Sequence, residues 1–136
     1  MADLQSLIAE VDNHIDEIVK LEQDLVRIPS VNTGFMPTGD ETPVAEYCQK
    51  WFASEGIDSK IMSRDPERGN IIAVMPGDKA KTRLMLMSHT DVVPVEDDTK
   101  WNYEPFGAEI SAGRVYGRGA SDCKALLSSQ MMAMAI

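Results

Sequence analysis

The sequence is poor in cysteine, in basic side chains and in long apolar runs. It has two cysteines, Cys48 and Cys123, too few for a disulfide framework, so a reducing cytoplasm is the simpler assumption. Its 13 Lys and Arg against 22 Asp and Glu give a net charge of −9. This argues against nucleic acid or an anionic membrane as a partner, since both require a basic surface. No apolar run reaches the roughly 20 residues of a membrane span, and the acidic N-terminus lacks the basic start of a signal peptide.

What the sequence does contain is typical of a globular domain. Hydrophobic residues make up 43% and charged residues 26% of the 136 residues, enough for one domain with its own core. The final stretch, KALLSSQMMAMAI, keeps a helical pattern to its last letter, without the glycine or basic residues that usually end a helix. We therefore expect residues 1–136 to be a truncated part of a larger protein.

Two segments have the apolar periodicity of helices. Residues 4–27 predict one long helix, which Pro29 ends. A second helix is expected to begin with Thr42 as N-cap and Pro43 at the first helical position, and to stop at Gly56. Its apolar face consists of Val44, Tyr47, Cys48, Trp51 and Phe52.

Strand patterns follow the second helix. Residues 57–62 predict an edge strand, whereas residues 70–77 and 83–89 are near-continuous apolar runs that suit strands buried on both faces. A hairpin is expected around Ala112 and Gly113, and a further helix is expected to begin near Asp122. This order of elements indicates an α/β fold, with a sheet between layers of helices, in a single domain.

A histidine and an aspartate follow the apolar run at residues 84–87. Ligands of open α/β sheets gather at the carboxyl ends of strands, and residues two apart in extended backbone point to the same side. His89 and Asp91 can therefore act together, while Ser88 points away, which disfavours a hydrolase triad. One interpretation is a metal-binding imidazole oriented by a carboxylate. The alternative, for this short motif alone, is a structural histidine beside a turn-forming aspartate.

A second polar stretch, GRVYGRGASDCK, ends in another aspartate. Gly117 and Gly119 allow a close approach of the backbone, and Asp122 is either an N-cap or a carboxylate that projects into the same crevice as His89. A phosphate-binding loop is disfavoured, because the required glycine and hydroxyl positions are missing. We expect Cys123 to be a small buried residue rather than a metal ligand.

Together these motifs resemble the zinc-dependent aminoacylase, acetylornithine deacetylase, succinyl-diaminopimelate desuccinylase and carboxypeptidase G metallopeptidase family. The resemblance rests on SHTDVVP (88–94), EPFGAEISAGRVYGRGASDCK (104–124), LVRIPSVN (25–32) and GNIIAVMPG (69–77). It implies that His89 binds a metal ion, that Asp91 is the catalytic carboxylate behind it, and that Asp122 bridges two ions. Family members often continue the last motif with methionine, lysine and glycine, where this chain has Cys123, Lys124 and Ala125.

The resemblance also implies an activity. Residues 1–136 would be the N-terminal part of a catalytic metal-binding domain with a mixed central sheet, and a lid and dimerisation domain lies elsewhere. The expected reaction is hydrolysis of an amide bond in an N-acyl amino acid or small peptide, by a water that two zinc ions activate; cobalt and manganese remain open. The full-length protein is expected to be a cytoplasmic enzyme and a candidate homodimer.

The expected site is incomplete, and two alternatives to an enzyme remain. The general-base glutamate and the remaining ligands of the family cannot be assigned within 136 residues, and His14 is expected to lie on the surface. We therefore expect this segment alone to be inactive. A non-catalytic relative that acts as a binding or regulatory protein is the alternative function, and a stand-alone helical interaction module is the second, which the buried-strand patterns disfavour.

Overall fold

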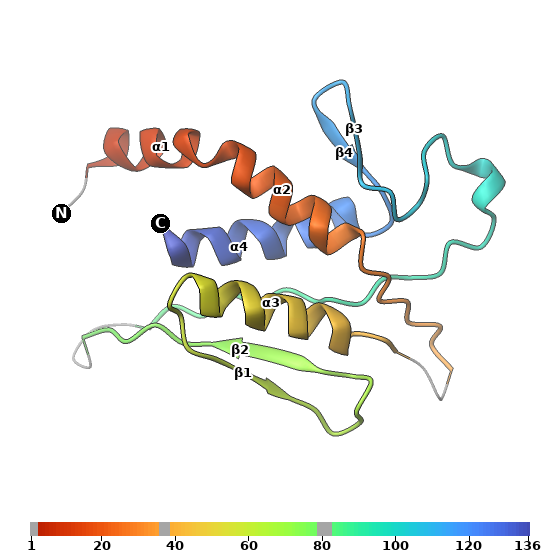
Figure 1. Ribbon diagram of the computed structural model, residues 1–136, viewed down its shortest axis with the longest axis horizontal. Coiled ribbons are helices and arrows are strands. Elements are labelled where there is room, and N and C mark those ends of the chain that lie inside the picture. Colours follow the sequence, from red (N-terminus) through yellow and green to blue (C-terminus); the bar gives the residue numbers. More distant parts are fainter. Residues whose placement is uncertain (1–2, 36–38, 79–82) are drawn as a thin grey trace.

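The computed structural model describes residues 3–35, 39–78 and 83–136 and consists of four α-helices, four short strands and two short turns of other helix (Figure 1). The helices are α1 (Leu4–Asn13), α2 (Ile15–Val26), α3 (Thr42–Ser54) and α4 (Ala125–Ala135). The strands are β1 (Ser59–Met62), β2 (Asn70–Ala73), β3 (Glu109–Ser111) and β4 (Arg114–Tyr116). A 3-10 turn η1 (Asp98–Lys100) and a π-type turn η2 (Ala120–Lys124) complete the fold. No helix in these ranges is long and apolar enough to cross a membrane.

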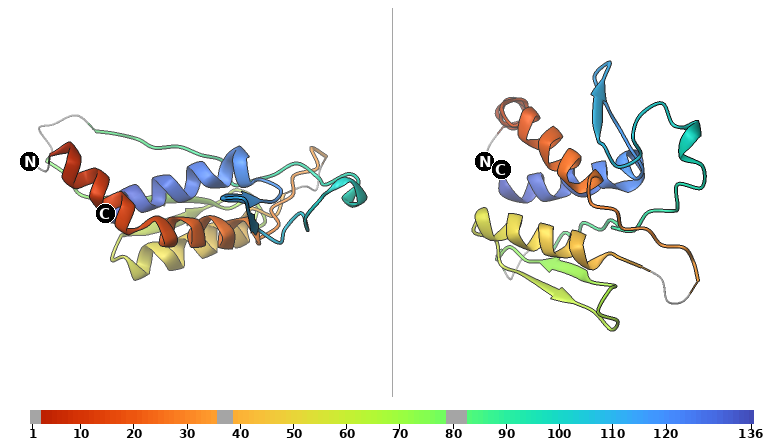
Figure 2. Two further views of the ribbon diagram at one scale, coloured as in Figure 1. Left: turned by 90° about the horizontal axis from the view of Figure 1, so that it is seen from above. Right: turned by 45° about the vertical axis from the view of Figure 1, so that its right-hand side comes forward.

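The helices form a layer against which strands pack. In Figure 1, α4 lies between α2 and α3, and the β1–β2 pair lies below α3, which contacts both strands. The β3–β4 hairpin projects from the opposite side of the layer, beside the end of α2 (Figure 2). An extended segment, residues 83–91, runs behind α3 and α4 in Figure 1 and leads toward the start of η2. The α/β class expected from the sequence is confirmed.

Strand pairing is local and of mixed direction. β1 and β2 are antiparallel, with Ser59 opposite Ala73, and β3 and β4 form the hairpin predicted around Ala112 and Gly113, both of which have positive φ. A parallel bridge joins Val31 to Val92 and links the loop after α2 to the end of the extended segment. This bridge places the loop that follows α2 next to the predicted site residues.

Two local expectations about the helices are corrected by the structure, and a third is confirmed. The helix predicted over residues 4–27 is broken at His14, where φ is −107° and ψ is 11°, so that α1 and α2 have different axes. Helix α3 has Glu41 as its N-cap, because the Thr42 hydroxyl instead donates to the Pro66 carbonyl and accepts from the Gly69 amide. Gly56 follows the end of α3 with φ +71°, as predicted for a stop.

The run at residues 83–89 is extended but is not a buried strand. Leu84 is 84% exposed, and Met85 and Met87 are also exposed. The described residues supply this run with no strand neighbours, so its apolar side chains remain largely exposed. The apolar face of α1 is exposed in the same way, and α1 has no buried residue.

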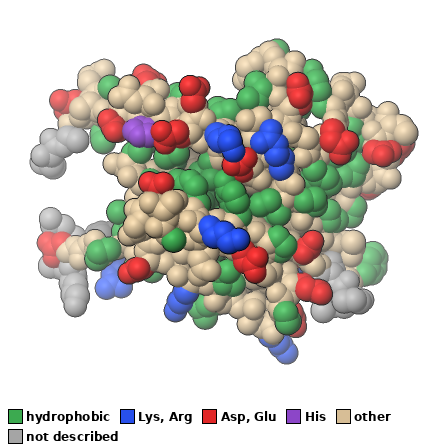
Figure 3. Space-filling view, viewed as in Figure 1, with side chains coloured by type: hydrophobic (Ala, Val, Ile, Leu, Met, Phe, Trp, Pro, Cys, Tyr) green, Lys and Arg blue, Asp and Glu red, His purple; other side chains and the backbone are tan. Residues whose placement is uncertain are grey.

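The core lies between α2, α3 and α4 and includes part of the apolar face predicted for α3. Hydrophobic side chains also gather in the middle of the face shown in Figure 3. Burying each large aliphatic side chain contributes roughly 1.5–3 kcal/mol. The cluster consists of Leu21, Leu25, Val44, Cys48, Phe52, Ile57, Leu127 and Met131. This core fixes α4 against α2 and thereby fixes the turn η2 that precedes α4.

A buried lysine closes the junction of α2, α4 and η2. Lys124 has no exposed surface, and its ammonium donates to the carbonyls of Leu25 at 2.9 Å and Ile28 at 2.7 Å. Burial lowers the pKa of Lys124 to about 8. The two carbonyls lie at and beyond the end of α2, where unpaired acceptors and the helix dipole favour a cation.

We expect Lys124→Met to destabilise the fold by about 1–3 kcal/mol, because methionine fills similar space but leaves two buried carbonyls without a donor. The loss of stability is limited, because the substitution also removes the cost of burying the charged ammonium. Urea unfolding followed by circular dichroism measures it as a lower midpoint at unchanged slope. The exposed Lys50 on α3 supplies the control variant, Lys50→Met, which should change the stability by less than about 0.5 kcal/mol. Equal midpoints for the two variants would contradict the assignment.

Candidate metal centre

The backbone around Asp122 is shaped by close contacts at two glycines. A Cβ on Gly117 would lie 2.5 Å from Val26, and a Cβ on Gly119, whose φ is +85°, would lie 2.5 Å from Val92. The close approach predicted at these glycines is therefore confirmed. It brings the start of η2 against both α2 and the end of the extended segment.

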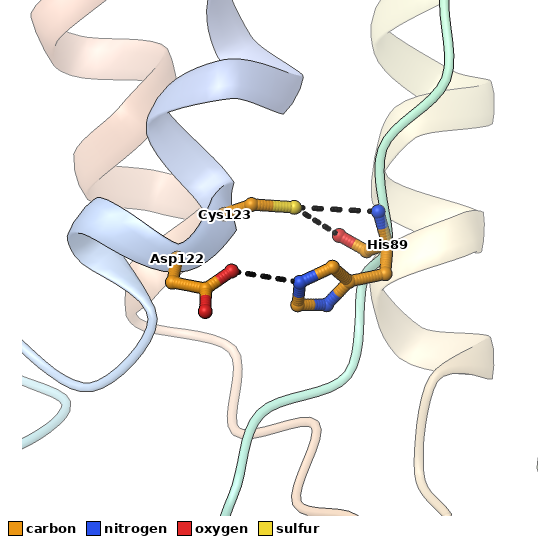
Figure 4. A group of neighbouring side chains, drawn as sticks. All are labelled: His89, Asp122 and Cys123. Atoms are coloured by element: carbon orange, nitrogen blue, oxygen red, sulfur yellow. Dashed lines mark hydrogen bonds and ion pairs between the residues drawn. The ribbon is translucent and has the colours of Figure 1, made fainter.

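Asp122 is not an N-cap. Its backbone is extended, with φ −125° and ψ 95°, it is joined to Cys123 by a cis peptide bond, and α4 begins three residues later without a side-chain cap. The side chain is 88% exposed and points toward the imidazole of His89 (Figure 4). Of the two interpretations left open by the sequence, the structure shows a carboxylate directed at His89.

The imidazole of His89 lies between two aspartates. Its Nε2 is 2.9 Å from Oδ1 of Asp122, and its Nδ1 is 2.9 Å from the carbonyl oxygen and 3.3 Å from Oδ1 of Asp91. The structure therefore brings together all three site residues predicted from the sequence, although 33 positions separate His89 from Asp122. That they bind metal remains a prediction at this point.

The pKa of His89 is raised from its usual value of 6.5, mainly by the hydrogen bond to Asp122, against a smaller opposing effect of burial. The backbone carbonyl and the charge of Asp91 raise it further. Both partners of the ring are acceptors, so both ring nitrogens must carry a proton to donate to them. The charged ring stabilises the fold below about pH 6.5, and this contribution is lost as the pH rises through the raised pKa.

This arrangement fits a divalent cation in place of one proton. Two ligand atoms about 2.0–2.1 Å from a tetrahedral zinc lie roughly 3.3 Å apart. The 2.9 Å between Nε2 of His89 and Oδ1 of Asp122 needs to widen by only a few tenths of an ångström. On the other side of the ring, Asp91 can hold the Nδ1 proton and so fix the tautomer that offers Nε2 to a metal.

Two residues at this site were not identified from the sequence. Asn32 donates from Nδ2 to Oδ2 of Asp91 at 3.0 Å, which fixes the carboxylate behind the histidine. Cys123, expected to be only a small buried residue, is buried, but its thiol contacts the backbone of His89. Asn32 lies in the motif at residues 25–32, which was the one available signal for it.

The site lines a pocket of about 260 Å³. Its walls include His89, Asp91 and Asp122 from the predicted set, together with Arg118 and Ser121. The Arg118 guanidinium lies 4.9 Å from the ring centre of Trp101, within the range of a cation–π contact. His14 lies elsewhere, at the break between α1 and α2, with Nδ1 2.8 Å from the Glu10 carbonyl. Within the described ranges, His89, Asp122 and Cys123 form the group whose ligand atoms all lie within 4.8 Å of one another.

We expect Asp122→Asn to lower the pKa of His89, because the neutral amide removes both the charge and the stronger acceptor. NMR titration of the imidazole signals in metal-free buffer measures the change. His14, the other histidine, is an internal control whose pKa should stay constant. An unchanged pKa of His89 in this variant would show that the two side chains are apart in solution.

Comparison with known proteins agrees with the motifs. Residues 85–136 match the model of peptidase family M20/M25/M40. The chain is 30% identical over 134 residues to N-formyl-4-amino-5-aminomethyl-2-methylpyrimidine deformylase of Halalkalibacterium halodurans, an alignment that covers 96% of this chain and 30% of that protein. It is 39% identical over 107 residues to succinyl-diaminopimelate desuccinylase 1 of a Ruegeria species, which covers 78% of this chain and 26% of the relative.

A solved structure shares the fold. The M20 family metallo-carboxypeptidase Sso-CP2 from Sulfolobus solfataricus superposes with a TM-score of 0.72 at 25% identity, over 88% of this chain and 26% of that one. The chain thus spans 26–30% of the length of these three proteins. These matches agree in relating the chain to peptidase family M20/M25/M40, whose model residues 85–136 match.

Proposed function

We propose that His89 and Asp122 bind a divalent metal ion, zinc by preference, in a hydrolase that cleaves an amide bond. The observation that supports this most directly is the 2.9 Å contact between Nε2 of His89 and Oδ1 of Asp122, from two separate segments that meet at a pocket. Imidazole nitrogen and carboxylate oxygen are ligands that zinc accepts readily. Cobalt or manganese would use the same pair.

In this proposal each residue has a separate task. His89 offers Nε2 to the metal, and Asp91 holds the opposite ring nitrogen and is itself held by Asn32. Asp122 is 88% exposed, so its carboxylate has room to bridge a pair of ions. When bound, zinc supplies a Lewis acid that polarises the scissile carbonyl and lowers the pKa of a water to about 7.

The proposed substrate is an N-acyl amino acid or a short peptide. The names of the relatives support an amide or peptide bond, since they describe a deformylase, a desuccinylase and a carboxypeptidase. We propose a cytoplasmic location, which the free thiols of Cys48 and Cys123 support. A homodimer of the full-length protein belongs to the same proposal, and a non-catalytic relative with the same metal pair is the competing function.

We expect the purified chain to bind Zn²⁺, and His89→Ala and Asp122→Ala each to weaken that binding about tenfold or more, because each removes one ligand. Competition with a chromophoric chelator at fixed pH measures the dissociation constants. His14→Ala, at the break between α1 and α2, and Asp16→Ala, in the first turn of α2, remove the same two residue types elsewhere and should leave the affinity unchanged. Wild-type affinity in the His89→Ala variant would refute the proposed centre.

The 136-residue chain itself should show no turnover of N-acyl amino acids, with or without added zinc. A catalytic zinc usually has three protein ligands, and the described residues supply His89 and Asp122 as the proposed pair. Release of free amino acid, followed by a ninhydrin-type assay, tests this expectation. Turnover that disappears in the Asp122→Ala variant would show that the chain holds a complete centre and would overturn the expected inactivity.

A further inference from the structure

We propose that Cys123 is a positioning residue, whose thiol fixes the backbone of His89 so that the imidazole meets Asp122. The inference rests on the proposed metal-binding function of His89 and Asp122 and assigns a further residue to it. Cys123 does not touch the reacting atoms in this proposal, because it acts through the main chain of His89 (Figure 4).

One sulfur atom serves both polar groups of the His89 main chain. The His89 amide donates to Sγ of Cys123 at 3.3 Å, and the thiol donates to the His89 carbonyl at 3.2 Å. A thiol can fill both roles because it is a weak donor and a weak acceptor. A thioether, as in methionine, can only accept, so it could keep the first contact but not the second.

The extended segment needs such a contact at this point. Its neighbouring carbonyls are held by side chains, since Gln130 donates to Met87 at 3.0 Å and the Ser30 hydroxyl donates to Thr90. Regular strand pairing is absent from residues 83–91 as far as the described part of the chain goes. In a sheet, a neighbouring strand would supply the hydrogen-bond partners of this backbone. At His89, the proposed metal ligand, the thiol of Cys123 supplies them instead.

The same geometry argues against Cys123 as a metal ligand. Its side chain is buried, and its sulfur is engaged by the amide and the carbonyl of His89, whereas the neighbouring carboxylate of Asp122 is open to the pocket. Groups that orient a ligand without touching the metal typically contribute 10–100-fold to metal affinity. A small rotation of the His89 backbone would produce a larger displacement of Nε2, because this atom lies at the far end of the ring.

Two measurements on Cys123→Ala and Cys123→Ser test the proposal. In Cys123→Ala we expect faster amide hydrogen exchange at His89 and Zn²⁺ affinity weaker by about tenfold. The hydroxyl of Cys123→Ser is also a donor and an acceptor. This variant should therefore recover part of the slow exchange at His89 and part of the Zn²⁺ affinity. The amide of His14, which donates to the Val11 carbonyl, should exchange as in the wild type.

Cys48→Ala is the matched control, because Cys48 is also buried but lies in the helical core. It should lower the stability and leave the zinc affinity unchanged. If Cys123→Ala behaves like Cys48→Ala, with His89 exchange changed only in proportion to global stability, the positioning role is wrong. If the wild type binds no zinc, the proposed function fails for this chain, and exchange at His89 alone then decides whether Cys123 fixes the backbone.

Discussion

The candidate site depends on the buried ammonium of Lys124 more than on any other contact. A lysine without exposed surface is stable only where acceptors replace its water, and here the carbonyls of Leu25 and Ile28 do so at the end of α2. This contact ties the turn before α4 to α2. Because Asp122 and Cys123 immediately precede Lys124, their side chains are placed by an interaction that lies in the core.

The other part of the site, the segment that carries His89 and Asp91, is fixed by the loop after α2. Ser30 and Asn32 hold Thr90 and Asp91, and the parallel bridge between Val31 and Val92 lies between them. The same helix therefore positions both sides of the site, one through its last carbonyls and the other through the chain that follows it. Rigid support of this kind suits a metal centre, whose ligands must be held to within about half an ångström.

The sequence predicted the members of the site but not the contacts that hold it. His89, Asp91 and Asp122 could be grouped because two rules are local: polar residues follow strands, and glycines allow close approach. The partners Asn32 and Cys123 depend on tertiary contacts across 59 and 34 positions, which no local pattern specifies. The same holds for Lys124, since a lysine in a helical pattern is expected at the surface.

For the fold, the apolar face of α3 and the hairpin at Ala112 and Gly113 could be predicted because turn chemistry and periodicity agree there. The break at His14 could not, since the apolar spacing continues through it. Residues 83–89 show the limit of reading burial from composition. Their apolar residues correctly predict an extended chain. Burial, however, requires neighbouring strands that the described residues do not supply.

Three consecutive side chains in η2 reach three different places: Asp122 the ring of His89, Cys123 its main chain, and Lys124 the end of α2. Adding or deleting one residue there would rotate all three away from their partners at once. The exposed turn at η1 is held differently, by local side-chain contacts among Asp97, Thr99 and Lys100. Chain length is consequently fixed between Gly119 and Lys124, whereas the short turn at residues 97–100 tolerates insertions and deletions more easily.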